Sequence, residues 1–91
     1  MDIIEKARKA AKENNIEIKR IFNVGSDEIF EIVTMTTPES EVSGDGFDDV
    51  IFGVNKKTNQ EAFSTFMGLP NENGFEELDY NSLTYTEYND I

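Results

Sequence analysis

The chain has 91 residues, enough for one small domain, and its 19 acidic and 8 basic side chains give a net charge of −11. It contains no cysteine and no histidine, which excludes disulfides, cysteine-based zinc sites and catalytic mechanisms that use histidine as a base. The small number of basic residues argues against direct binding to DNA or RNA, because that affinity depends on neutralising phosphates.

Neither a secretory signal nor a membrane span is predicted, since the longest apolar run, 50–54, has only five residues. We therefore expect one domain, residues 1–91, in a reducing cytoplasmic setting and away from membranes. Its charge is unevenly placed. Residues 1–20 carry six basic and four acidic side chains, whereas residues 21–91 carry fifteen acids and only two lysines.

Residues 2–14 have the pattern of an amphipathic helix. Apolar side chains recur on one stripe, and Asp2 stands where a capping residue is expected, three residues before Glu5. Asn14 and Asn15 predict the end of the helix, because asparagine tolerates the left-handed conformation found there.

The next two segments, 16–24 and 28–36, predict a β-hairpin with its turn at 25–27. In the first strand, strict alternation places Phe22 and Val24 on one apolar face with the preceding isoleucines, Ile16 and Ile18. The second strand is apolar on both faces, which is typical of a strand at the centre of a sheet.

Residues 38–49 are rich in acids and contain two glycines, so we expect a polar loop. A second hairpin follows, with strands at 50–55 and 60–67 and Asn59 in a left-handed position of the turn. Residues 75–80 predict a short helix, and 83–88 predict a final edge strand or a loose tail. The predicted fold class is α+β, with the N-terminal helix packed on one antiparallel sheet of about four strands.

The acidic loop has three interpretations: a solvated loop, a contact surface for a basic partner, or a calcium site. Counted from Asp45, the spacing lacks the glycine and the final glutamate of an EF-hand, so we expect no metal and no cofactor. Phe47 within the loop is a candidate exposed anchor. The candidate partner-binding residues are Glu39, Glu41, Asp45, Phe47, Asp48, Asp49, Glu72, Glu76, Glu77 and Asp79.

Catalysis is not expected. Two carboxyls acting as acid and base need a cleft, and a domain of this size has little room for one. Glu31, on the predicted central strand, has two interpretations: an ordinary residue of an exposed face, or a half-buried acid paired with Lys19 or Arg20.

Four stretches resemble small bacterial immunity proteins of the YrhB type: residues 27–31, 54–61, 67–70 and 75–78, which read DEIFE, VNKKTNQE, MGLP and FEEL. The chain departs from that pattern at Asn55 and Asn59, where the family has Asp and Gly, and it lacks the tryptophan. The resemblance implies an immunity-like role and no catalytic residues.

The acidic charge and the resemblance lead to one main hypothesis, a non-catalytic inhibitor or immunity-type protein that sequesters a basic protein such as a toxin nuclease. Three alternatives stay open: a DNA-mimicking phage inhibitor, a housekeeping domain whose acidity serves only solubility, and a weak calcium or ligand module. A homodimer formed through an exposed edge strand is a further possibility.

Overall fold

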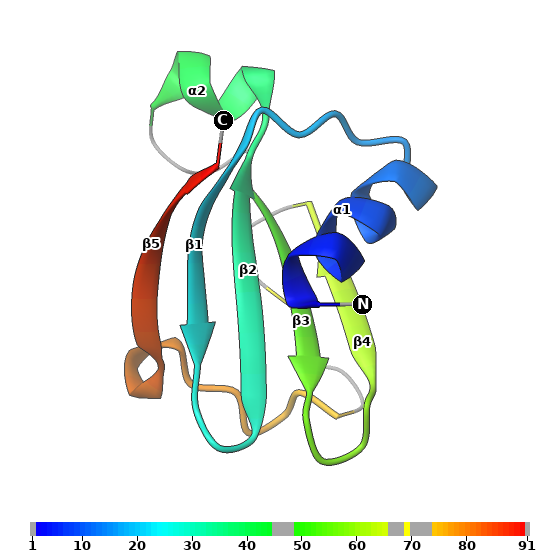
Figure 1. The fold of residues 1–91 in the computed structure, drawn as a ribbon, viewed down its shortest axis with the longest axis vertical. Coiled ribbons are helices and arrows are strands. Elements are labelled where there is room, and N and C mark those ends of the chain that lie inside the picture. The colour runs from blue at the N-terminus through cyan, green and yellow to red at the C-terminus, as the bar shows by residue number, and fades with distance from the viewer. Residues whose placement is uncertain (1, 45–48, 66–68, 70–73, 91) are drawn as a thin grey trace.

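The computed structural model describes residues 2–44, 49–65, 69 and 74–90, and within them one helix packs on a five-stranded antiparallel sheet (Figure 1). The strand order is β4-β3-β2-β1-β5. The elements in chain order are α1 (Ile3–Glu13), β1 (Arg20–Ser26), β2 (Phe30–Thr36), α2 (Pro38–Ser43), β3 (Val50–Asn55), β4 (Glu61–Ser64), the 3₁₀ turn η1 (Tyr80–Ser82) and β5 (Thr84–Asp90). The predicted α+β class is confirmed, with one strand more than expected.

Helix α1 begins and ends as its sequence predicts. The Asp2 carboxylate accepts a hydrogen bond from the Glu5 backbone N–H at 2.8 Å, which satisfies one of the free donors of the first turn. At the other end, Asn14 caps the helix and Asn15 has a φ of 58°, the left-handed conformation that lets the chain turn away. The alanines Ala7 and Ala11 are buried, so the helix lies close to the sheet.

Strand β2 lies at the centre of the sheet and is apolar on both faces, as predicted. Val33 and Met35 belong to a core with Ala7 of α1, on the face that we call the front. Phe30 and Ile32 belong to a second core on the opposite face, the back. Helix α1 packs on the front of the sheet against β2 and β3, and in Figure 1 no helix lies over β1 and β5 on that side.

The segment 74–83, which we call the crossing segment, covers the back face. It crosses the lower end of the sheet in Figure 1, from the β3 side to β5. Phe75 stacks on Phe30 with ring centroids 5.7 Å apart. The Asn55 side-chain amide donates to the Gly74 carbonyl at 2.7 Å and fixes the beginning of the segment. At its end, Leu83 is buried and β5 begins. The predicted edge strand at 83–88 is confirmed as β5.

Three local predictions are wrong. The first concerns Phe22, which was expected in the core. A β-bulge between Ile21 and Asn23 shifts the alternation, so Ile21 is fully buried and Phe22 is 44% exposed. The side chains of β1 therefore do not alternate strictly between the two faces of the sheet from Arg20 to Val24, although the sequence pattern predicted that they would.

The other two concern helices. Residues 38–43, predicted as loop, form helix α2, because Thr37 and Pro38 supply a cap and a first helical residue. Residues 75–80, predicted as a short helix, contain no α-helix: they have a turn at 76–77, and the 3₁₀ turn begins at Tyr80. Here the burial of Phe75 and the bond between Asn55 and Gly74 direct the backbone more strongly than local helix propensity does.

Candidate functional site

Helix α2 stands at the end of the sheet where β2 finishes and β3 begins (Figure 1). Its first turn is closed by a reciprocal capping box. The Ser40 N–H donates to the Thr37 hydroxyl oxygen at 3.1 Å, and the Thr37 N–H donates to the Ser40 hydroxyl oxygen at 2.8 Å. Both residues are buried, and Gly44 ends the helix with a φ of 70°. A six-residue helix is thereby given a fixed conformation at both ends.

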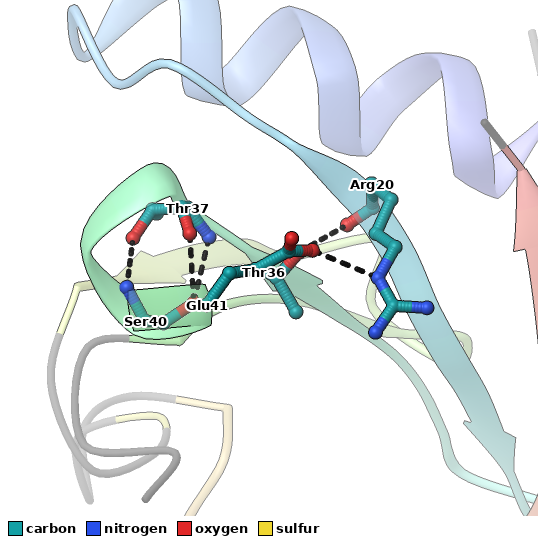
Figure 2. Close-up of polar contacts among 5 residues, drawn as sticks. All are labelled: Arg20, Thr36, Thr37, Ser40 and Glu41. Atoms are coloured by element: carbon teal, nitrogen blue, oxygen red, sulfur yellow. Dashed lines mark hydrogen bonds and ion pairs between the residues drawn. The ribbon is translucent and has the colours of Figure 1, made fainter. Parts of the chain in front are cut away.

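A polar contact fastens α2 to the sheet. Figure 2 shows the Glu41 carboxylate between Thr36 and Arg20. Its Oε2 atom accepts hydrogen bonds at 2.8 Å from the Thr36 hydroxyl and at 2.8 Å from the Arg20 Nε–H. The hydrogen bond from Thr36 and then that from Arg20 hold the pKa of Glu41 below its ordinary value. Glu41 is therefore an anionic link between the helix and two strands.

Apolar side chains are exposed around this link. Val42 is 89% exposed on α2, and Phe22 is 44% exposed on β1. Phe22 lines a hollow of about 440 Å³ with Arg20, Glu41 and Asp49. On the other side of α2 a second hollow of about 400 Å³ includes Glu39 and Glu17. We call Phe22, Glu39, Glu41, Val42 and Asp49 the α2 surface.

The charge of the α2 surface is mixed. Glu39, Glu41 and Asp49 are acidic, but Arg20 is paired with Glu41, and the charges of both Arg20 and Lys19 favour the ionised form of Glu41. The surface thus combines exposed apolar groups with carboxylates on both sides of a rigid helix. That combination suits contact with a protein better than it suits binding of a small charged ligand.

The remaining predicted residues lie elsewhere. Glu76, Glu77 and Asp79 are exposed in the crossing segment, at the end of the sheet opposite α2. Two of them serve local structure, since Glu76 accepts from the Gly74 N–H at 3.0 Å and Asp79 accepts from the Asn81 N–H at 3.0 Å. The structure therefore divides the described candidates into two groups and does not bring them into one patch. Asp45, Phe47, Asp48 and Glu72 lie outside the described residues.

Three residues of interest were not identified from the sequence. Phe22 was assigned to the core because a bulge leaves no mark in an alternating pattern. Val42 and the role of Arg20 were missed because 38–49 was interpreted as a loop. A signal for α2 does exist, since a threonine followed directly by proline is a helix-start pattern. The suggested pairing of Glu31 with Arg20 is not found, and Arg20 bonds to Glu41 instead.

Two further properties of the described ranges bear on function. They hold no group of three or more carboxylates placed to bind a metal ion. No helix in them has the length and apolar character needed to cross a membrane.

Comparison with known protein families, with curated proteins and with solved structures found no match for this chain.

Proposed function

We propose that this protein is a non-catalytic binding module that contacts a basic protein through the α2 surface, in the manner of an inhibitor or immunity-type protein. The partner class follows from the charge of −11, which attracts positively charged surfaces over several ångströms and speeds their association. We place the encounter in the cytoplasm, where a chain without cysteine loses nothing to reducing conditions.

The observation that carries the proposal is the exposure of Val42 on a helix that cannot easily move. Its 89% exposed side chain sits one residue after Glu41, which is bonded to both Thr36 and Arg20. A rigid apolar contact costs little conformational entropy on binding, and nearby carboxylates add orientation through charge. Phe22, on the same end of the sheet, supplies an aromatic contact of the kind enriched in interfaces.

The test is capture of partners from the source cells with tagged protein at low and high salt. Two double variants with the same change in net charge are compared: Glu39→Lys with Asp49→Lys on the α2 surface, and Glu76→Lys with Glu77→Lys on the crossing segment. We expect one stoichiometric basic protein, lost with the first variant and at high salt, and retained with the second. Val42→Ser should also weaken capture.

Other results would point elsewhere. Loss of the partner only with the crossing-segment variant would assign binding to the opposite end of the molecule. No basic partner at either salt concentration would contradict the proposal and favour acidity that serves solubility. A captured nucleic-acid enzyme that DNA displaces would favour the DNA-mimic alternative.

A further inference from the structure

The outer edge of β5 is long and is paired with no other strand within the described part of the chain. Strand β5 has seven residues and pairs there only with β1, whereas the opposite edge strand, β4, has four. Proteins usually guard such an edge with lysine, proline or a short strand, because its free N–H and C=O groups can pair with another chain. β5 contains neither lysine nor proline, and its charged residues are the acids Glu87 and Asp90. A register shift against β1 at Ile21–Asn23 affects its last residues, so Thr84–Glu87 form its regular part.

The register of β5 gives its two faces different characters. Tyr85 and Glu87 lie opposite Gly25 and Asn23, on the back of the sheet, and Thr86 lies opposite Val24, on the front. The Tyr85 hydroxyl donates to the Tyr80 carbonyl at 2.8 Å, which holds its 44% exposed ring in place over the back face.

On the front, Thr86 and Tyr88 border a groove that also reaches the beginning of α1. This groove of about 340 Å³ extends to Ile3 and Ile4 at the beginning of the helix. The groove also contains two acids, Asp2 before α1 and Glu31 on β2, and β1 separates Glu31 from the edge. An added strand would therefore meet an acidic and aromatic face on the back, and Thr86 and Tyr88 of β5 on the front.

The charge near the back of this edge is negative. Glu87 belongs to β5, and Asp79 directly precedes Tyr80, whose carbonyl accepts the hydrogen bond from the Tyr85 hydroxyl. Burial, and then the charges of Tyr80 and Asp79, raise the pKa of that hydroxyl. No basic residue follows Lys57 in the chain. Lys56 contacts the neighbouring strand: its Nζ donates to the Ser26 hydroxyl at 3.1 Å. Ser26 lies opposite Thr84, the first residue of β5.

We propose that the free edge of β5 binds an extended segment of a basic protein by strand addition, with lysine or arginine on the back face beside Glu87 and Asp79, and apolar residues on the front face beside Thr86 and Tyr88. Residues opposite each other across such a pair have their Cβ atoms about 4.5–5.5 Å apart, which suits an ion pair with Glu87. A second copy of this chain fits poorly, since it also carries a net charge of −11 and would present an acidic strand.

This inference goes beyond the proposed function, because the α2 surface takes no part in it and its test needs no natural partner. The test is an NMR titration of the full chain with a capped synthetic peptide that alternates lysine with valine. One control peptide has glutamate in place of lysine. A second keeps lysine but carries N-methyl groups on alternate backbone amides, which removes hydrogen-bond donors without changing charge.

We expect saturable shifts of the amide resonances of Thr84–Asp90, no binding of the glutamate peptide, and binding at least about tenfold weaker for the N-methylated peptide. The Glu87→Gln variant should raise the dissociation constant about two- to fivefold. Glu77→Gln, which makes the same charge change on the crossing segment, should leave it unchanged.

Four results would overturn the proposal: absence of binding, equal binding of the N-methylated peptide, shifts confined to the α2 surface, or equal effects of the two glutamine variants. Shifts of the β5 resonances with protein concentration alone would assign the edge to a second copy instead. Failure of the α2 variants in partner capture would leave this titration unaffected, so the two proposals fail separately.

Discussion

The ring of Tyr85 on β5 lies against Gly25 of β1, so closely that a Cβ atom at Gly25 would come within 2.6 Å of Tyr85 Cε1. The two residues are paired in register on the back of the sheet. Glycine is required here for space, and the contact holds the edge strand to its neighbour. The hydrogen bond from Tyr85 to Tyr80 at 2.8 Å limits how far the ring can move aside.

Gly25→Ala should therefore destabilise the protein by about 1–3 kcal/mol, because a methyl group forced into a packed site displaces its neighbour. The double variant with Tyr85→Ala should lose less than the sum of the two single losses, since truncating the ring makes room for the methyl group. Urea unfolding of the four proteins measures this coupling. If the losses of stability in the two single variants simply add in the double variant, the Tyr85 ring does not exclude a side chain at Gly25.

The turn between β1 and β2 depends on Asp27. Its Oδ1 atom accepts from the Ile29 N–H at 2.8 Å and from the Phe30 N–H at 2.6 Å. Partial burial is the largest single influence and opposes ionisation, but the bonds from Phe30, Ile29 and the Ser82 hydroxyl, with the charge of Lys56, outweigh it. The pKa of Asp27 is thus below its ordinary value of 3.8.

Because the pKa of Asp27 is lowered in the folded state, its ionised carboxylate stabilises the fold at any pH above the ordinary pKa of this side chain. This contribution is lost as the pH falls through the lowered pKa of the folded protein. Asp27→Asn, which keeps an acceptor but no charge, should be less stable than the native chain at pH 7. The difference should shrink below pH 3.8. Unfolding in urea across this range, with Glu28→Gln as the control in the same turn, checks the expectation. A difference that does not vary with pH would contradict it.

Thr37 should be necessary for α2. Thr37→Ala removes the hydroxyl that accepts from the Ser40 N–H, and loss of such a cap costs about 0.5–2 kcal/mol. Thr37→Ser retains the acceptor and should cost much less. Urea unfolding measures the loss, and amide hydrogen exchange shows where it acts, with faster exchange expected at residues 39–43 of α2. Equal losses in the two variants would show that the threonine methyl group, not the cap, matters.

Much of the fold follows from local patterns in the sequence. The stripe and caps of α1, the two-faced strand β2 and the turn at Asn59, whose φ is 62°, were all predicted because each depends on residues close in the chain. The cover of the back face was not predicted. It depends on contacts such as that of Phe75 with Phe30, 45 positions earlier, and no local pattern specifies them.

The candidate site was less predictable. Counting acids located Glu39, Glu41 and Asp49, but it did not separate a carboxylate held by Thr36 and Arg20 from one open to solvent. It also grouped residues that the sheet holds at opposite ends, because charge along a chain says nothing about which strand ends meet. The exposed apolar residues of the α2 surface depend on a bulge and on a short capped helix, both of which interrupt simple periodicity.

The bulge gives the last prediction, since Ile21 and Phe22 exchange the roles that strict alternation assigns to them. Ile21 is fully buried in the front core, so Ile21→Ala should cost about 2–4 kcal/mol. Phe22 is 44% exposed, and despite its larger side chain Phe22→Ala should cost less than about 1 kcal/mol. Urea unfolding of both variants gives the comparison. A greater loss for Phe22→Ala would mean that the strand keeps its alternation in solution and that the α2 surface lacks its aromatic residue.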